Sequence, residues 1–156
     1  MKEIIWVFGT SASGKETFLE KLLGDNELQK LIGINDMRIA VSQESLRNLG
    51  KLDQSRSSIL DEVTQLIESN DAVVIKWQYG DTLLHTPNTL QDKFPACKHI
   101  MIKLNVARDE QVRRLRTKTW WRDKGQEDDF IAKEVLLVEN SLSELGTQFI
   151  IRELEW

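Results

Sequence analysis

The sequence has little of what usually holds very small or membrane-bound proteins together. It has one cysteine and two prolines in 156 residues. A single cysteine forms no internal disulfide, and Cys97 lies in no metal-ligand spacing. Since a free cysteine is most often a small buried hydrophobe, we expect that role for Cys97. No apolar run approaches the roughly 20 residues that cross a bilayer, and the chain is long enough to bury a core without staples.

An excess of positive charge is also missing. The formal net charge is -4 at pH 7, so the chain as a whole does not attract nucleic acid or an anionic membrane. Any anion-binding site must come from a local cluster of lysine and arginine. The first apolar run, residues 4–8, is too short for the core of a signal peptide and is followed by glycine. We therefore expect a cytoplasmic protein whose partners include neither membrane nor nucleic acid.

What the sequence does have is an alternation of short apolar runs with helical patterns. Apolar runs predict strands at 4–8, 38–41, 72–77, 99–104 and 149–151. Helical spacing predicts helices at 15–23, 28–32, 54–68, 107–118 and about 128–145, with room for small helices in the gaps. In the last helix we expect a cap at Asp128 or Asp129, a stop at Gly146, and a core face of Ile131, Val135, Val138, Leu142 and Leu145. This alternation predicts an α/β fold with a parallel sheet between helices.

The most specific motif follows the first predicted strand. Gly9-Thr10-Ser11-Ala12-Ser13-Gly14-Lys15 fits the phosphate-loop pattern Gly-x4-Gly-Lys, between a buried strand and an amphipathic helix. Backbone N–H groups of such a turn surround phosphate oxygens, and the helix N-terminus adds partial positive charge. Lys15 adds a point charge against the outer phosphates. The motif predicts a nucleoside triphosphate site, with ATP as the expected ligand.

The residue after Lys15 departs from the usual form of this motif. That position commonly carries the Ser or Thr that binds Mg²⁺, whereas here it is Glu16, with Thr17 one later. The order Gly-Lys-x-Thr is similar to the Gly-Lys-Gly-Thr of adenylate-kinase-like enzymes. That resemblance implies that Glu16 or Thr17 holds Mg²⁺ through water, and that Thr17 contacts a phosphate nearer the nucleoside. Alternatively, Glu16 simply points outward and is stabilised by the helix dipole.

The layout of the whole chain resembles the P-loop nucleoside and nucleotide kinases. Residues 99–106 lead into residues 108–116, similar to the family's strand, short turn and helix ending in Arg-Leu-x-x-Arg. The resemblance implies three α-β-α layers around a five-stranded parallel sheet of order 2-3-1-4-5. It also implies one domain over residues 1–156, with an arginine-bearing lid at about 113–126.

Positive charge gathers in the segment that the resemblance assigns to the lid. Residues 103–124 contain eight Lys or Arg and three Asp or Glu. Guanidinium groups clamp phosphate oxygens, and a closing lid excludes water from the transferred group. The alternative is a solvated basic helix face with Asp109 and Glu110 as ion-pair partners. The expected catalytic residues are Lys15, Arg116, Arg122 and Arg113.

Two neighbouring tryptophans, Trp120 and Trp121, stand beside these charges. One interpretation is that an indole stacks on a base or on an arginine. The other, which we favour, is that one or both pack against the core where the lid meets the last helix.

Acceptor residues are expected where the second and third strands end, because the carboxyl ends of parallel strands meet beside the loop. Glu44 or Asp81 suits a base for a hydroxyl acceptor, Arg47 suits an acceptor phosphate, and Gln78 suits a base edge. Each is also an ordinary residue of a polar loop.

The predicted function is ATP-dependent transfer of the γ-phosphoryl group to a small-molecule acceptor, a nucleoside or a nucleotide, with Mg²⁺ as cofactor. The third strand, 72–77, lacks the terminal Asp that completes the Mg²⁺ shell in many phosphate-loop ATPases. This disfavours a motor or switch ATPase. It leaves open a catalytically inactive or regulatory nucleotide-binding module. A GTPase ranks last, because no Asn-Lys-x-Asp motif follows a strand.

Overall fold

Five parallel strands form one sheet in the order β2-β3-β1-β4-β5. The computed structural model describes residues 1–47, 52–77, 85–145 and 148–156. Every pairing of neighbouring strands is parallel, and β1 lies in the middle. The predicted sheet and its strand order are therefore confirmed. The strands are β1 (Glu3–Phe8), β2 (Ile39–Val41), β3 (Ala72–Trp77), β4 (Lys98–Asn105) and β5 (Ile150–Glu155).

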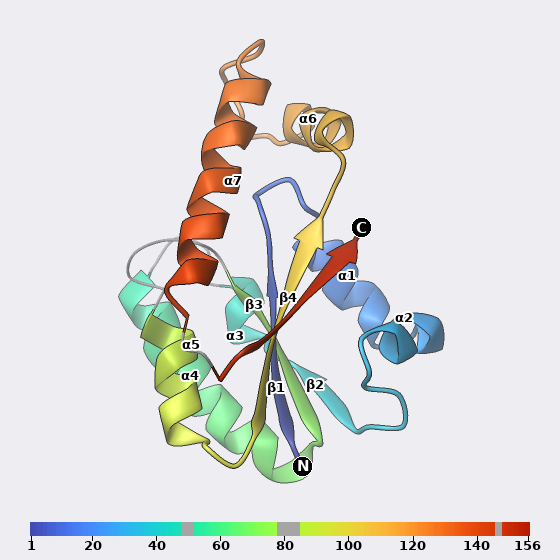
Figure 1. Cartoon of the computed structure of the whole chain (residues 1–156), viewed down its shortest axis with the longest axis vertical. Coiled ribbons are helices and arrows are strands. Elements are labelled where there is room, and N and C mark those ends of the chain that lie inside the picture. Colours follow the sequence, from blue (N-terminus) through green and yellow to red (C-terminus); the bar gives the residue numbers. More distant parts are fainter. Residues whose placement is uncertain (48–51, 78–84, 146–147) are drawn as a thin grey trace.

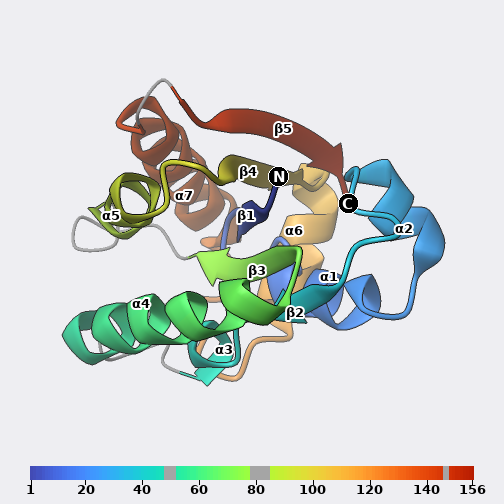
Figure 2. The same ribbon diagram turned by 90° about the horizontal axis from the view of Figure 1, so that it is seen from below.

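Helices cover both faces of this sheet, which gives the three predicted layers. Figures 1 and 2 show α4 (Leu52–Ser69), α5 (His85–Lys93) and α7 (Glu127–Ser143) on one side, with α1 (Lys15–Leu22) and α2 (Asn26–Leu31) on the other. The short α3 (Glu44–Arg47) follows β2, and α6 (Arg108–Arg116) lies beyond the carboxyl end of β4 (Figure 1). Within the described ranges, no helix is long and apolar enough to cross a membrane.

The central strand is buried along its whole length because its side chains alternate between two cores. Trp6 and Phe8 pack with Trp77 on the side of α4, whereas Ile5 and Val7 pack with α1. The ring centroids of Phe8 and Trp77 lie 4.3 Å apart, and those of Trp6 and Trp77 lie 6.2 Å apart in an edge-on arrangement. Burial on both faces explains why the first strand is a continuous apolar run.

Helix α7 differs from its prediction in two respects. Asp128 and Asp129 lie in its first turn and do not cap it, and the N-cap residue Gln126 makes no side-chain cap hydrogen bond. The predicted cap is therefore wrong, although carboxylates in a first turn still stabilise the helix dipole. Val135 is 39% exposed, so its predicted place in the core is also wrong. The buried face instead passes through Glu134, which apolar periodicity does not detect. The predicted stop at Gly146 lies outside the described residues.

The contacts of Cys97 and of the buried His99 indicate structural roles for both residues. Cys97 is half-buried and packs against the core below α4, and burial raises the pKa of its thiol. His99 shares a hydrogen bond with the carbonyl of Phe94 at 2.8 Å. These contacts agree with the role that we expected for Cys97.

Trp77 provides a test of the aromatic core. It is 2% exposed, so Trp77→Ala should lower the free energy of unfolding by about 3–5 kcal/mol in a urea titration. Trp120, which is 50% exposed, supplies the matched control: Trp120→Ala should change the free energy of unfolding by less than about 0.5 kcal/mol. Equal losses in the two variants would contradict the assignment of the core.

Candidate functional site

The glycine-rich loop leaves the carboxyl end of β1, between the ends of β3 and β4. In open α/β sheets, this change of direction in strand order creates a crevice in which ligands bind. Gly14 has φ 80° and is the N-cap of α1, with no side-chain cap hydrogen bond. Because the first N–H groups of a helix have no acceptor within the helix, those of α1 are available to an anion.

Both glycines of the motif are required by close approach. A Cβ on Gly9 would lie 2.6 Å from the Ser13 hydroxyl, closer than real contacts allow. A Cβ on Gly14 would lie 3.0 Å from both an Arg114 guanidinium nitrogen and the Trp156 indole nitrogen. The loop therefore lies tightly against α6 and the residue that follows β5, and its left-handed backbone at Gly14 favours glycine.

Lys15 is buried beneath the loop that contains it. Its Nζ donates to the carbonyl of Gly9 at 3.0 Å and to that of Thr10 at 2.6 Å, and the residue is 6% exposed. Burial, and after it the nearby Lys76 ammonium, lower the pKa of Lys15 to about 7. A buried ammonium with so low a pKa gains strongly from a phosphate partner.

The outer turn of the loop is held by α6 and α7. The Ser11 N–H donates to Glu134 Oε2 at 3.2 Å, and the Ser11 hydroxyl donates to the same oxygen. The Thr10 hydroxyl donates to Gln111 Oε1 at 2.7 Å, and the Gln111 amide donates to the carbonyl of Val106. Sequence reasoning missed Glu134 and Gln111. The available signal was a polar residue at a core-facing position of each helix.

Glu16 is paired with a lysine from the next strand of the sheet. Lys76 Nζ donates to Glu16 Oε1 at 2.6 Å. The Lys76 side chain is 2% exposed, whereas that of Glu16 is 57% exposed. The hydrogen bond from Lys76 is the main cause that holds the pKa of Glu16 below its usual value. Lys76 is the penultimate residue of β3. Phosphate-loop ATPases usually carry an Asp that binds Mg²⁺ near the end of this strand.

Two cavities lie at the start of α1 and share Gly14 and Thr17 in their linings. The first has a volume of about 420 Å³, and its lining includes Lys15, Glu16, Lys76, Lys118 and Trp120. The second has a volume of about 350 Å³, and its lining includes Lys21, Arg113, Arg114, Lys118 and Trp156. Lys118 also lines both cavities.

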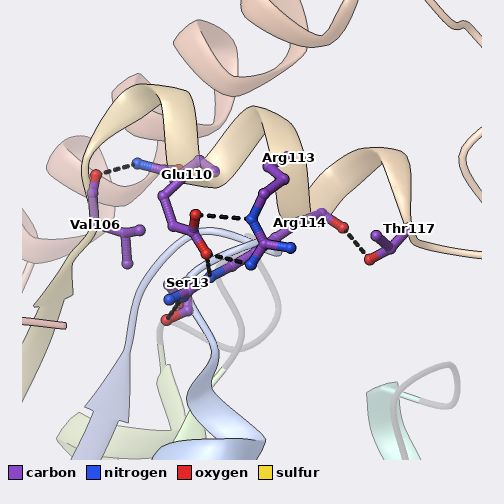
Figure 3. Close-up of polar contacts among 7 residues, drawn as sticks. Ser13, Val106, Glu110, Arg113, Arg114 and Thr117 are labelled. Atoms are coloured by element: carbon purple, nitrogen blue, oxygen red, sulfur yellow. Dashed lines mark hydrogen bonds and ion pairs between the residues drawn. The ribbon is translucent and has the colours of Figure 1, made fainter.

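The arginines of α6 are largely neutralised by ion pairs. Arg113 pairs with Glu110 at 2.5 Å, and Arg114 pairs with the same carboxylate at 3.0 Å (Figure 3). Arg114 also donates to the carbonyl of Ser13 at 3.1 Å, so it is the arginine that contacts the loop. The alternative of a paired helix face thus describes part of this segment. Sequence reasoning did not select Arg114, because the choice requires the rotation of α6 about its axis.

The other two predicted arginines lie away from both cavities. Arg116 donates to Glu127 Oε1 at 3.2 Å and is 61% exposed in its side chain. Arg122 is exposed in the segment that joins α6 to α7. Over the ranges that the structure describes, Lys118, Arg122 and Lys124 take part in no ion pair. The catalytic roles of Arg113, Arg116 and Arg122 stay predictions.

The paired tryptophans have different surroundings. Trp121 is 9% exposed and packs on Phe130 of α7, with ring centroids 4.9 Å apart. Its indole N–H donates to Glu127 Oε1 at 3.3 Å. The favoured packing interpretation therefore describes Trp121. Trp120 is 50% exposed and lines the first cavity, so its indole face is open to a ligand.

The acceptor residues predicted after β2 lie on α3. Glu44 is its first residue and Arg47 its last. The Glu44 N–H donates to Glu62 Oε2 at 3.3 Å, and the Ser45 hydroxyl accepts from the N–H of Lys76 at 3.1 Å. These bonds hold α3 beside the end of β3. The other two predicted residues, Gln78 and Asp81, lie outside the described residues.

Comparison with known proteins shows which solved structures share the fold of this chain. No protein-family model and no curated protein sequence matches the chain. The chain is similar to a deoxyadenosine kinase from M. mycoides with bound dATP, with 16% identity and a TM-score of 0.55, over 99% of this chain and 91% of that one. The chain has the fold of the P-loop small-molecule kinases.

Two further solved structures are similar at the same low level. One belongs to the PezAT toxin-antitoxin system of Streptococcus pneumoniae, with 15% identity and a TM-score of 0.57, over 99% of this chain and 68% of that one. The other is a shikimate kinase from Bacteroides thetaiotaomicron, with 16% identity and a TM-score of 0.47, over 96% and 85%. The two structures with TM-scores above 0.5 show the fold of the chain and no particular reaction.

The lowered pKa of Lys15 predicts a specific pH dependence of stability. Folding takes this pKa from 10.5 to about 7. Between these values the unfolded chain binds a proton that the folded chain lacks, so the free energy of unfolding rises with pH, by at most about 1.4 kcal/mol per pH unit. Urea titrations of the wild type and Lys15→Met across this window isolate the effect, because all other groups are common to both. A difference that does not change with pH would contradict the prediction.

Proposed function

We propose that the chain binds ATP with its phosphates in the loop, and that it transfers the γ-phosphoryl group to a small-molecule acceptor, a nucleoside or a nucleotide. The observation that carries the proposal is that the start of α1 lines two separate cavities, with Gly14 and Thr17 in both linings and Lys15 in the first. A phosphotransferase needs one compartment for the donor nucleoside and one for the acceptor, with the phosphates between them. The P-loop kinase fold supports the same assignment.

The second cavity suits the donor nucleoside. Trp156 follows the carboxyl end of β5, and its ring meets Phe18 edge-on at 5.2 Å and lies 5.6 Å from Lys21 Nζ. The backbone N–H of Trp156 donates to the carbonyl of Asn105, which holds the residue against β4. A braced aromatic ring beside the Arg114 guanidinium offers flat surfaces on which a base stacks. The nucleoside of the bound nucleotide would then extend from the loop, past Thr17, into the second cavity.

The first cavity suits the acceptor and the migrating group. As the acceptor O–P bond forms, the bond from the γ-phosphorus to the bridging oxygen breaks, and its electron pair leaves with ADP. The ammonium groups of Lys15 and Lys118 stabilise the charge that develops on the transferred group. A hydroxyl acceptor also loses a proton. Glu44, the predicted base, lies on α3 and is not in the lining of this cavity, so we assign that role to no residue. An acceptor phosphate needs no such base.

The described residues of the first cavity do not fit a protein-held Mg²⁺. Mg²⁺ prefers oxygen ligands, chiefly carboxylates and phosphates. Glu16 Oε1 is already bonded to Lys76, and the ammonium groups of Lys15 and Lys118 share the same cavity. We therefore leave the predicted binding of Mg²⁺ through Glu16 or Thr17 out of the proposal and assign no step to the metal.

A second candidate function is a nucleotide-binding module that transfers no phosphoryl group. The observation in its favour is Lys76, a cation at the end of β3 in place of an acidic metal ligand. Such a module would bind ATP at the same loop, and acceptors would not stimulate its turnover.

ADP release in a coupled assay separates these two functions. We expect turnover to require one member of a panel of nucleosides, nucleoside monophosphates, small sugars and small acids. Lys118→Met should then lower kcat about 100-fold, because one donor to the developing charge is lost. Lys30→Met, which removes an exposed lysine of α2, is the matched control and should leave kcat unchanged. Tight ATP binding without acceptor-stimulated turnover would reject the kinase and support the module.

The orientation of the nucleotide is tested by two tryptophan variants. Trp156→Ala should weaken ATP binding about tenfold, because a stacking surface contributes roughly 1–3 kcal/mol per base. Trp120→Ala, a change of the same size on the acceptor side, should leave ATP affinity unchanged. Isothermal titration calorimetry measures both affinities, and Trp156→Phe should retain most of the binding. The opposite pattern would place the nucleoside in the first cavity and contradict the assignment.

A further inference from the structure

The pair of Glu16 and Lys76 occupies the two positions from which phosphate-loop NTPases hold Mg²⁺. In those proteins, a Ser or Thr after the loop lysine and an Asp on a neighbouring strand bind the metal. Here the first position is Glu16, and the strand position is Lys76, in register with Val7 of β1. Lys76 Nζ and Glu16 Oε1 are 2.6 Å apart. A fixed ammonium therefore lies where a metal ion would be expected.

Burial differs greatly between the two members of this pair. The side chain of Lys76 is 2% exposed, whereas that of Glu16 is 57% exposed. A buried ammonium requires an anionic partner, because its desolvation is costly. The exposed Glu16 side chain can rotate into solvent at little cost, provided that another anion takes its place on Lys76. A phosphate oxygen bound in the adjoining cavity supplies such an anion, with a charge-assisted hydrogen bond.

The remaining charges of the first cavity also favour a free triphosphate. Lys15, Lys76 and Lys118 line it, and among the described residues of its lining Glu16 is the acidic one. In the described part of the chain, no group of three His, Cys, Asp or Glu residues is arranged to hold a metal ion. These lysines repel a divalent cation and attract a tetra-anion. Binding of Mg²⁺ to ATP removes two of the negative charges that the lysines would otherwise neutralise.

We propose that this chain binds its nucleoside triphosphate without a metal ion, with the Lys76 ammonium bonded to a phosphate oxygen in place of Mg²⁺ and Glu16 displaced into solvent. The inference rests on the proposed binding of ATP at the loop, and not on phosphoryl transfer. Mg²⁺ then competes with the protein for the phosphates.

Calorimetric titration with ATP, in EDTA and in excess Mg²⁺, tests this inference. The wild type should bind ATP about tenfold more tightly in EDTA, as expected for one charged hydrogen bond that the metal would replace. Lys76→Met should lose about tenfold of the affinity measured in EDTA. Glu16→Gln should strengthen binding of ATP in EDTA, because an uncharged amide competes with the phosphate for Lys76 more weakly than the carboxylate does. Lys30→Met is the matched charge control and should bind as the wild type does.

The possible outcomes separate this inference from the proposed function. Tighter binding in excess Mg²⁺, or equal affinities that Lys76→Met leaves unchanged, would overturn the inference alone. No ATP binding under either condition would reject the proposed function, and the inference with it. Thermal unfolding of Lys76→Met shows whether the buried substitution permits folding. If it does not, Glu16→Gln decides, since its exposed side chain is not needed for the core, and unchanged affinity in EDTA would overturn the inference.

Discussion

The hydrogen bonding of β1 between β3 and β4 is the constraint on which the candidate site depends. Because β1 is buried on both faces, its carboxyl end delivers the loop to the middle of the sheet. Groups from three other elements reach the loop and the start of α1 there: Lys76 from β3, Gln111 and Arg114 from α6, and Glu134 from α7. Each supplies a contact that the local sequence of the loop cannot make. The loop is therefore shaped by the fold as much as by its glycines.

The distribution of charge explains how an acidic chain presents an anion site. Most of the basic residues of α6 are paired with carboxylates, and Arg113 and Arg114 share Glu110. The lysines at the loop come from separate elements and are opposed in the first cavity by Glu16. Local convergence of the buried Lys15 and Lys76 with the exposed Lys118 creates the positive potential, which needs no basic overall composition. Burial, and after it the charge of Lys76, also lowers the pKa of Lys15.

Sequence reasoning predicted the parts of this molecule that depend on local pattern. Strand burial, sheet order and the loop motif all followed from short-range spacing or from the resemblance that the spacing supported. Contacts between distant elements did not follow. Glu134 and Lys76 look like ordinary polar residues until the topology places them against Ser11 and Glu16. Val135 was assigned to the core because its neighbours are apolar, although the rotation of α7 turns it outward. No sequence pattern indicated a role for Trp156.

The bond from Ser11 to Glu134 joins residues that are 123 positions apart in the chain. Trp156, against Gly14, comes still later in the sequence. During synthesis the loop leaves the ribosome before the helix and the strand that position it. The strand pairs that surround β1 can form before the loop acquires its final conformation. The anion site is thus complete only after α7 and β5 have been synthesised. A nascent chain that lacks them does not yet have the complete site.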